Sequence, residues 1–548
     1  MPSVAPWLYA WVSGALCGFA VHHGIFIRGE WHVKAPRIVV GHVLMFLTLH
    51  LLGYLTQGTS LFAVGHGFVL MSYGYLPGLF LSMTVYRVFF HRLTREGFPG
   101  PWYAPISKLW HVWACRDSMN HVLLDKLHKQ YGDFVRTGPS EITIYRPEIF
   151  MATDGPHSEC KKADWYDLLK PNLALVSARD RDIHAVRRRQ WNRAFSTKAL
   201  KVHEEKIIRH LDELDRRIEI EAKAGHVSNA KNMFYWFAFD AMGDFVLGKP
   251  FGMQQNQEWH HIIVRMQSAL SILGPLSPTP WMIHIGFKLA PRILQLRDWF
   301  DLEAWCRGQM SERLQDKSRH QEPDITHYIM MEDGENQEII HNALLWLSGD
   351  SMQAMAAGSS PIANTLLGLF TEVGRTTGAS DKLYDELNGV DASDVKALAT
   401  LPYLNACIDE TLRLYPALMT GGTRMTTQNG MTVAGRYIPP YTNIVAPQYL
   451  ISRREDCFVD PCRFVPERWT TSPEMVLNPS ATRPFGMGHL SCIGRPLALD
   501  ALRLVVARLI KKYRFRYAPG EDGSGMWRDM KDQFVQNPGE LKLRFELR

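Results

Sequence analysis

A cysteine near the C-terminus, Cys492, lies in a sequence that favours a reactive sulfur. A helical pattern runs from just after this residue to about Lys512, and Pro496 suits its first turn, where a missing N–H group costs nothing. The sulfur is therefore expected at a helix N-terminus. There, free backbone N–H groups and the positive end of the helix dipole stabilise a thiolate. A thiolate of this kind can bind a metal.

The glycines around Cys492 suggest that a flat cofactor lies close to the sulfur. Gly488 and Gly494 allow a tight turn and a close approach of the backbone to a cofactor, and Phe485 can shield the sulfur from water. Two other interpretations exist. Cys492 can be an inert buried thiol, as most cysteines in apolar surroundings are. Gly486 and Gly488 can also suggest a dinucleotide loop, but the third glycine and the strand–helix context are missing.

This segment resembles the haem-binding loop of the cytochrome P450 family. The matching residues are Phe485, Gly488, Cys492, Gly494 and Ala498. The resemblance implies a haem b cofactor (iron protoporphyrin IX), with Cys492 as the axial ligand to the metal and as a catalytic residue. Phe485 and Gly488 are then cofactor-binding residues. Leu490 stands where the family usually has an arginine that binds a haem propionate, and His489 is a candidate substitute.

A second resemblance lies upstream, in an acid and a base three residues apart on one helix face. Glu410 and Arg413 have this spacing, and Arg468 follows in a proline-marked loop. The family uses such a trio to lock a segment against the core near the cysteine loop. We interpret the three residues as structural, because a buried ion is tolerated only when it is paired.

Haem propionates are carboxylates and require charge-assisted donors. His184 and Arg188 have the spacing of the family's Trp-x-x-x-Arg helix, with histidine in place of tryptophan. Arg424 occupies the position of another family propionate partner. We therefore expect His184, Arg188 and Arg424 to bind the cofactor. Arg187 and Arg189 are interpreted as part of a solvated basic face.

The long, almost uncharged stretch 342–373 predicts a buried helix through the middle of the domain. In the family this helix crosses the distal face of the haem and carries Ala-Gly-x-Asp/Glu-Thr. Here Ala357 and Gly358 fit, but Ser360 replaces the acid and Pro361 replaces the alcohol, so a kink is expected. Our hypothesis is that Ser359 and Ser360, with ordered water or a substrate hydroxyl, deliver protons as catalytic residues.

The helices and strands that position the candidate site residues come after an apolar N-terminal region. Three stretches, 7–27, 38–55 and 61–90, are each about long enough to cross a bilayer, which takes roughly 20 apolar residues. We predict a membrane anchor of three transmembrane helices over residues 1–97 and a haem domain over 98–548. The alternatives are a cleaved signal peptide, or one anchor helix followed by buried helices.

Basic residues predict the orientation of the anchor. Arg28, Lys34 and Arg37 lie between the first two stretches, and further arginines end the third, which places these segments and the domain in the cytosol. Eight widely spaced cysteines do not resemble a disulfide framework and fit a reducing compartment. The predicted location is the endoplasmic reticulum membrane, with the catalytic domain facing the cytosol.

Composition limits the classes of function. Hydrophobic residues make up 46% and charged residues 21% of the 548-residue chain, as in ordinary folded proteins. The net charge of +6 is scattered, so no nucleic-acid partner is expected. The fold class that we predict is mainly α with small β-sheets, with strands near 134–144 and 431–445: a cytochrome P450 fold preceded by N-terminal transmembrane helices.

The resemblance, strongest to fungal microsomal members, implies a monooxygenase that inserts oxygen from O₂ into a hydrophobic small molecule of secondary metabolism. No nucleotide-binding loop is recognised, so electrons are expected from NADPH-cytochrome P450 reductase docking on the basic proximal face. An isomerase, dehydratase or peroxide-rearranging enzyme is an alternative, as is a non-catalytic haem-binding membrane protein. The segments that we expect in the pocket wall, where core packing is the other interpretation, are 174–177, 273–285 and 417–422.

Overall fold

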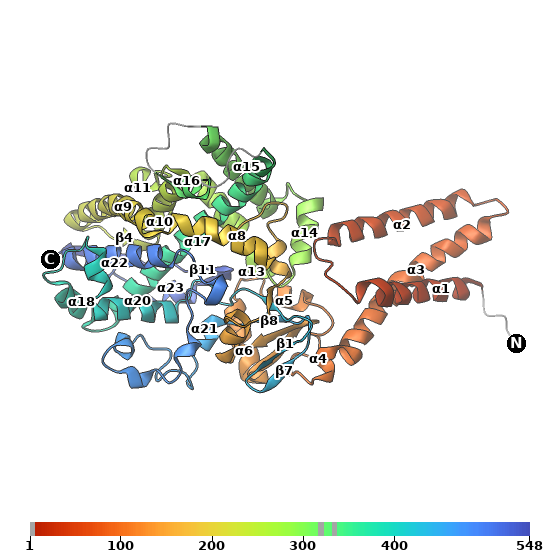
Figure 1. Ribbon diagram of the computed structural model, residues 1–548. Helices are drawn as coiled ribbons and strands as arrows, with labels where there is room; N and C mark the ends of the chain where they lie inside the picture. Colours follow the sequence, from red (N-terminus) through yellow and green to blue (C-terminus); the bar gives the residue numbers. More distant parts are fainter. Residues whose placement is uncertain (1–5, 316–322, 331–336) are drawn as a thin grey trace.

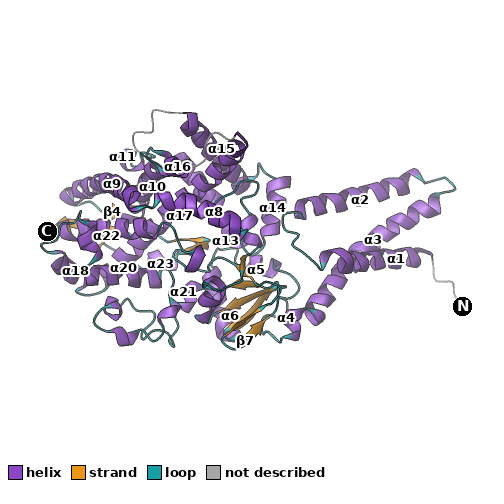
Figure 2. Cartoon of the chain, in the orientation of Figure 1, coloured by secondary structure: helices purple, strands orange, loops and turns teal. Residues whose placement is uncertain are grey.

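The arrangement of the chain is taken from a computed structural model that describes residues 6–315, 323–330 and 337–548. A mainly helical body carries the residues of interest, and the N-terminal helices project from it as an arm (Figure 1). Strands are few and gather mostly on one side of the body (Figure 2). The predicted fold class is therefore confirmed.

The arm contains three helices, α1 (Pro6–Val21), α2 (Ala35–Leu55) and α3 (Phe62–Val85). The segments Ala35–Leu55 and Phe62–Arg95 are long and apolar enough to cross a membrane. Helix α1 has 16 residues and continues as a π-helical turn over His22–Phe26. Large apolar side chains point away from the protein, with Leu47 and Leu81 61% and 66% exposed. Surfaces of this kind need an apolar environment to cover them.

Four glycines bring α1 and α3 into close contact. Gly14 and Gly18 lie four residues apart on α1, and Gly74 and Gly78 lie four residues apart on α3. A Cβ atom at any of the four would overlap a backbone carbonyl oxygen of the opposite helix. This is the small-x-x-x-small pattern by which membrane helices pack backbone against backbone.

The arm also contacts the body through the linker between α1 and α2. Helix α2 packs against α14 (Pro280–Leu289) of the body. His32 of the linker lies 2.8 Å from a carboxylate oxygen of Asp167. The end of the arm that meets the body is therefore the end at which the basic linker lies.

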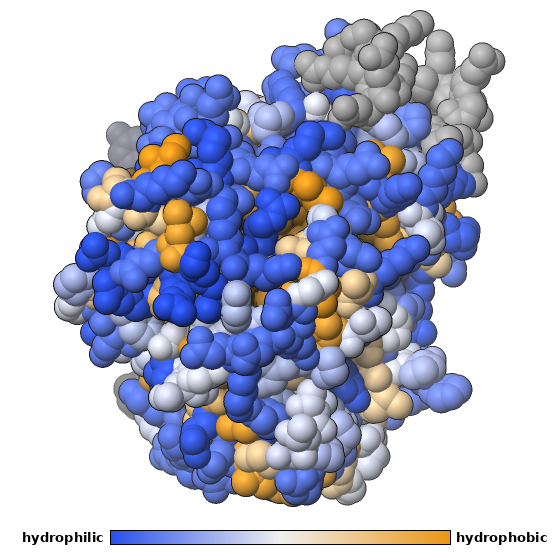
Figure 3. Space-filling view, turned by 90° about the vertical axis from the view of Figure 1, so that its left-hand side faces the viewer, coloured by the Kyte–Doolittle hydropathy of each residue, from blue (hydrophilic) through white to orange (hydrophobic). Residues whose placement is uncertain are grey.

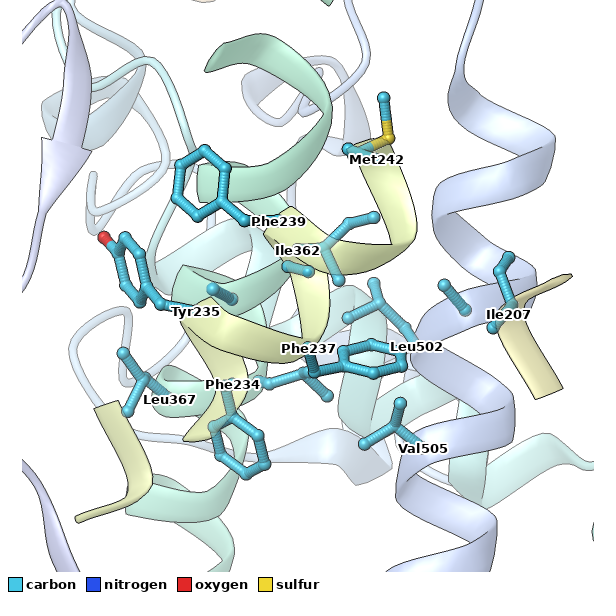
Figure 4. Packing of buried hydrophobic residues seen from close by; sticks show 14 of the residues in the cluster. Ile207, Phe234, Tyr235, Phe237, Phe239, Met242, Ile362, Leu367, Leu502 and Val505 are labelled. Atoms are coloured by element: carbon cyan, nitrogen blue, oxygen red, sulfur yellow. The ribbon is translucent and has the colours of Figure 1, made fainter. Parts of the chain in front are cut away.

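The core of the body is built from helices that are apolar on several faces. Helix α10 (Ala230–Leu247) packs along α17 (Gln337–Arg375), which contains the predicted long helix, and α22 (Arg495–Lys512) contacts α17 too. Phe237 of α10 and Leu502 of α22 meet in this core, near Ile362 of α17 (Figure 4). Because the protein interior is close-packed, helices that are buried on all sides hold their side chains in fixed positions relative to one another.

Two sheets flank the helices. The larger has the strand order β1-β2-β8-β5-β3, and β2 and β8 are parallel. The smaller has the order β4-β12-β9, and the pairs β6–β7 and β10–β11 form separate hairpins. Both predicted strand regions are confirmed. The strands are β1 (Phe134–Gly138), β2 (Glu141–Ile144), β3 (Lys161–Lys162), β4 (Ser228–Asn229), β5 (Arg424–Met425), β6 (Met431–Val433), β7 (Arg436–Ile438), β8 (Asn443–Val445), β9 (Tyr513–Tyr517), β10 (Lys531–Gln533), β11 (Val535–Asn537) and β12 (Lys542–Leu547).

The other helices complete the body, whose face opposite the arm is mainly hydrophilic (Figure 3). They are α4 (Arg92–Arg95), α5 (Leu109–Ala114), α6 (Asn120–Tyr131), α7 (Glu148–Asp154), α8 (Arg181–Ala194), α9 (Thr197–Ala224), α11 (Met253–Asn256), α12 (His261–Ser271), α13 (Leu273–Leu276), α15 (Leu294–Gln315), α16 (Ile325–Met330), α18 (Ala379–Leu387), α19 (Val395–Ala399), α20 (Pro402–Leu414), α21 (Gln448–Ile451) and α23 (Gly525–Arg528).

Candidate haem-thiolate site

A cavity of about 470 Å³ lies inside the body, between α17 and the loop that precedes α22. Cys492 lines it from the loop, and Ala357 and Gly358 line it from α17. Most of its wall is apolar, with Trp191 and Phe245 among the side chains. A cavity of this kind can enclose a large apolar group and keep water away from it.

The Cys492 side chain is exposed, but into this cavity and not toward bulk water. Burial raises the pKa of its thiol, while the backbone N–H groups of Gly494 and Arg495 and the charge of Arg188 lower it. The loop is closed by a 2.7 Å hydrogen bond from the Cys492 N–H to the carbonyl of Phe485. Helix α22 begins at Arg495, so the sulfur lies just before a helix N-terminus. The groups that favour a thiolate are therefore in place.

Phe485 lines the cavity beside the cysteine, whereas Gly488 is not among the lining residues. Gly488 has a φ of 61°, and a Cβ atom there would overlap the carbonyl oxygen of Asp154. The structure therefore gives Gly488 a role in the path of the backbone, and its assignment as a cofactor contact stays a prediction. Gly488 allows the loop to approach the end of α7, which no other residue could do without strain.

One edge of the cavity is basic. His184 and Arg188 line it from α8, and Arg424 lines it from β5. Arg188 donates a 2.5 Å hydrogen bond to the carbonyl of Ser491, which joins α8 to the cysteine loop. Burial lowers the pKa of His184 to about 4, with help from the charge of Lys162, so His184 is a neutral donor at pH 7.

Arg424 already has two partners in the protein, which leaves fewer of its donors for a haem propionate. It forms a 2.6 Å salt bridge with Asp154 and donates a 2.8 Å hydrogen bond to the hydroxyl of Tyr166. His489, the candidate substitute for the missing arginine, does not line the cavity. Its ring centroid lies 6.0 Å from that of His184. His489 is exposed, whereas its neighbour Leu490 lines the cavity.

Lys162 is a fourth basic residue at this edge, and sequence reasoning missed it. It lines the cavity, and its ammonium group donates to the carbonyls of Leu175, Val176 and Ala178 at 3.3, 2.7 and 3.0 Å. Burial lowers its pKa to about 7, and the charge of Arg424 contributes. Its strand has two residues and no motif, so only its place beside Arg424 in the sheet identifies it.

Arg187 is also different from the prediction, because it is buried rather than solvated. Its guanidinium donates at 2.5 Å to Asp350 of α17. The same carboxylate accepts from the indole of Trp191 and from the backbone N–H of Leu175. The helical turn places Arg187 on the inner face of α8, and Asp350 therefore ties α8 and the cavity wall to α17. Arg189 is exposed, as expected.

The two serines proposed as catalytic are not at the cavity wall. The wall residues of α17 include Ala357, Gly358 and Pro361, but neither Ser359 nor Ser360. A helix turns about 100° per residue, so Ser359 and Ser360 point away from the face that carries Gly358 and Pro361. Ser359 is fully buried among neighbouring elements, and its hydroxyl has no hydrogen-bond partner within the described residues.

The polar α17 residues at the wall are Gln353 and Thr365. Thr365 donates a 2.8 Å hydrogen bond to the carbonyl of Pro361, one turn earlier. The Gln353 side-chain oxygen accepts from the N–H of Val176 at 3.2 Å. A hydroxyl therefore reaches this part of the cavity, one helical turn beyond the family position.

Glu410, Arg413 and Arg468 meet in the core, and all three are at most 1% exposed. Arg413 donates to the two carboxylate oxygens of Glu410 at 2.8 and 2.9 Å, and Arg468 donates to one of them at 3.0 Å. The indole of Trp469 adds a 2.9 Å bond. The second arginine of the trio uses its remaining donors on backbone carbonyls, including that of Val459. Each buried charge is therefore paired.

The predicted wall segments contribute unequally. Three of the four residues in 174–177 line the cavity, and so do Ala417, Leu418, Gly421 and Gly422. From the segment 273–285 only Leu273 does. Its other residues lie in α13, in the turn that follows it and in the first part of α14, which packs against the arm.

The residues at this cavity fit a haem. A thiol at one side, small residues at another and a basic edge match the iron, the flat ring and the carboxylates of that group. A mainly helical body with this arrangement defines the class of haem-thiolate proteins.

Comparison with known proteins places the chain more closely. Residues 99–545 match the cytochrome P450 family. A cytochrome P450 monooxygenase named FCK2, from Fusarium pseudograminearum, is 33% identical over 97% of this chain and 96% of its own. A tryprostatin B 6-hydroxylase from Aspergillus fumigatus is 34% identical over 97% and 95%. The cytochrome P450 monooxygenase phqL from Penicillium fellutanum is 33% identical over 97% and 93%. The chain belongs to the cytochrome P450 family and is an enzyme of its monooxygenase type.

Proposed function

We propose that this enzyme inserts one oxygen atom from O₂ into a hydrophobic small molecule of fungal secondary metabolism, using haem b held by Cys492. The observation that carries the proposal is that Cys492 and the small residues Ala357 and Gly358 line one largely apolar cavity with a basic edge. The relatives support a role in secondary metabolism, since one of them is named for hydroxylating tryprostatin B.

Haem bound here supplies activation of dioxygen on an iron whose thiolate ligand favours cleavage of the O–O bond. The protein's own residues do the rest. We assign the haem carboxylates to Arg188, His184, Arg424 and Lys162, which are hydrogen-bond donors at one edge. Ala357 and Gly358 leave room for oxygen and substrate, and apolar side chains exclude water.

A proton must reach the oxygen site, and the family's acid–alcohol pair is absent. The hydroxyl of Thr365 holds a proton on its Oγ1 atom and lines the cavity. Because Pro361 has no N–H group, the carbonyl of Ala357 lacks its usual helical donor. We assign the relay to Thr365 with ordered water, in place of Ser359 and Ser360.

Electrons are proposed to come from NADPH-cytochrome P450 reductase, docking where the cysteine loop approaches the surface. Exposed cations occur there. Arg495 begins α22 just after the loop, and Arg189 adjoins Arg188. Lys198 follows Phe195, whose ring lies 4.0 Å from the Cβ position of Gly494. An acidic surface on the reductase would complement these charges.

The anchor is proposed to be residues 1–97, with three membrane helices, and the haem domain residues 98–548. The linker between α1 and α2 contacts the body, which supports its lying on the same side of the membrane as the domain. With the basic residues of that linker, this favours the cytosolic face of the endoplasmic reticulum.

The test is to express the full chain with the reductase in microsomes and supply candidate scaffolds with isotopically labelled O₂. The expected product carries one labelled oxygen and forms only with NADPH. Cys492→Ser should abolish both product and the thiolate-type Soret band of the reduced, carbon-monoxide-bound form, while Cys462→Ser, at another exposed thiol, should preserve both. Turnover without NADPH and O₂ would instead indicate an isomerase or dehydratase.

A further inference from the structure

A buried acid that the proposed reaction does not use lies beside the haem cavity. Asp532, on β10, is 3% exposed. Its Oδ2 atom has no hydrogen-bond partner among the described residues. An unpaired carboxylate oxygen in the interior is costly unless something binds it.

Asp532 lines a small side chamber of about 60 Å³. Several other polar groups there are already paired. The ammonium of Lys108 is 2.5 Å from Glu141 and 2.9 Å from His111. The other ring nitrogen of His111 is 2.8 Å from Asn120. Among the described side chains that line the chamber, Asp532 is the one whose buried side-chain oxygen has no hydrogen-bond partner.

The side chamber adjoins the main cavity. Four residues line both spaces, namely Trp165, Leu273, Gly421 and Phe534. The rings of Trp165 and Phe534 stack with centroids 4.1 Å apart. Phe534 lies in the turn between β10 and β11 with a φ of 73°, a conformation that costs energy for a residue with a side chain. The boundary of the two spaces is therefore aromatic and is held by a strained turn.

The chemistry of the chamber selects a cationic donor. A carboxylate oxygen accepts hydrogen bonds and attracts positive charge, and aromatic faces attract cations as well. The chamber has room for one small group or a few water molecules, but not for a ring system. Burial raises the pKa of Asp532 to about 7, against the Thr420 hydroxyl and the Phe534 N–H, so a bound cation would strengthen its charged form.

We propose that Asp532 binds a protonated amino group of the substrate in this side chamber, while the apolar body of the substrate occupies the main cavity. The inference rests on the proposed function in that it takes the substrate to be a hydrophobic small molecule. It narrows the substrate class to basic, nitrogen-containing compounds.

The test uses two probes of the same shape, an arylalkyl dimethylamine and its isopropyl analogue, in which carbon replaces nitrogen. Binding to the full-length, membrane-bound holoprotein is followed by the change in the Soret band and by thermal stabilisation. The wild-type protein should bind the amine about tenfold or more tightly than the hydrocarbon, the effect of one charge-assisted hydrogen bond. Asp532→Asn should abolish that preference and leave the binding of the hydrocarbon unchanged.

Two further variants make the result specific. Thr420→Val should weaken the preference, because its hydroxyl stabilises the charged carboxylate. Asp522→Asn, at an exposed acid, should keep it. Equal affinity of the two probes in the wild type would mean that the chamber holds water only, and it would overturn the proposal, as would a preference that survives in Asp532→Asn. An amine preference seen by thermal stabilisation without a thiolate-type Soret band would refute the proposed function and leave this site standing.

Discussion

Arg179 of the body donates two parallel hydrogen bonds of 2.7 and 2.8 Å to the carboxylate of Glu30, in the linker between α1 and α2 of the arm. The same guanidinium reaches Asp167 at 2.6 Å and the carbonyl of Lys162 at 3.0 Å. Residues near Asp167, such as Trp165 and Leu168, line the haem cavity. The arm is therefore bonded directly to a segment that forms the wall of the substrate site.

This contact predicts that Glu30→Gln loosens the cavity wall without affecting the cysteine loop. Glu30 is partly exposed, so the loss of stability should be only about 1 kcal/mol. Hydrogen exchange of residues 164–180 should accelerate and KM should rise, while kcat and the haem spectrum stay unchanged. Glu96→Gln, at an exposed acid just after α4, serves as the control. Unchanged exchange in Glu30→Gln would show that the bond does not hold the wall.

The buried trio predicts a much larger effect at Glu410. Glu410→Gln leaves two arginines buried with reduced compensation, and the free energy of unfolding should fall by about 3–5 kcal/mol. Denaturant unfolding and the yield of haem-loaded protein measure this. The neighbouring surface pair supplies a control. Glu467→Gln removes a carboxylate 2.7 Å from the exposed Lys382 and should cost less than about 0.5 kcal/mol. Similar losses in the two variants would contradict the structural role of Glu410.

Lys162 predicts that haem retention depends on pH. Its pKa falls from 10.5 to about 7 in the folded protein, so above pH 7 its amine is largely neutral when no anion is near. A haem carboxylate beside it favours the ammonium form, so haem binding takes up a proton above pH 7 and weakens as the pH rises. Transfer of haem to an excess of an apo-globin should accelerate from pH 7 to pH 9. In Lys162→Met the transfer should be faster at pH 7 and nearly independent of pH. A wild-type rate that does not change with pH would contradict this assignment.

Thr365 predicts a change in the coupling of electron use to product. Thr365→Val removes the α17 hydroxyl at the cavity, so product formed per NADPH should fall several-fold while peroxide release rises. Thr365→Ser restores the hydroxyl and should restore coupling. Ser360→Ala should have no effect, because that side chain is not part of the wall. Loss of coupling in Ser360→Ala alone would return the relay to the serines.

Local sequence patterns predicted those residues whose position is set by neighbours a few residues away in the chain. The helix N-terminus at Cys492, the Glu410–Arg413 pair and the face of α8 that carries His184 and Arg188 all depend on the chain within a few residues. Patterns of this kind also predicted the long helix and both strand regions. The sequence therefore indicated several of the residues that line the cavity, among them Cys492, His184 and Arg188.

Residues whose roles depend on distant segments were missed or misassigned. Lys162 lines the cavity because β3 pairs with β5, a contact between residues far apart in the chain. Arg187 is buried because Asp350 lies opposite it on another helix. Ser359 and Ser360 follow the family pattern in register, yet the phase of the helix turns them away from the cavity. Asp532 has no motif, and only the packing of β10 reveals its unpaired oxygen.

The paired glycines of α1 and α3 let the two helices pack backbone against backbone, and α2 packs on α3. The three helices of the arm therefore form one packed unit. A protein attached through one helix and a flexible linker can rotate over a bilayer. Here the arm is attached to the body both by the chain after α3 and by the bonds at Glu30 and His32. The orientation of the arm relative to the body is therefore set by these contacts. For the same reason, a shortened protein should lack residues 1–97 as a whole. Removing α1 alone would expose the glycine face of α3, which packs against α1 in the full chain.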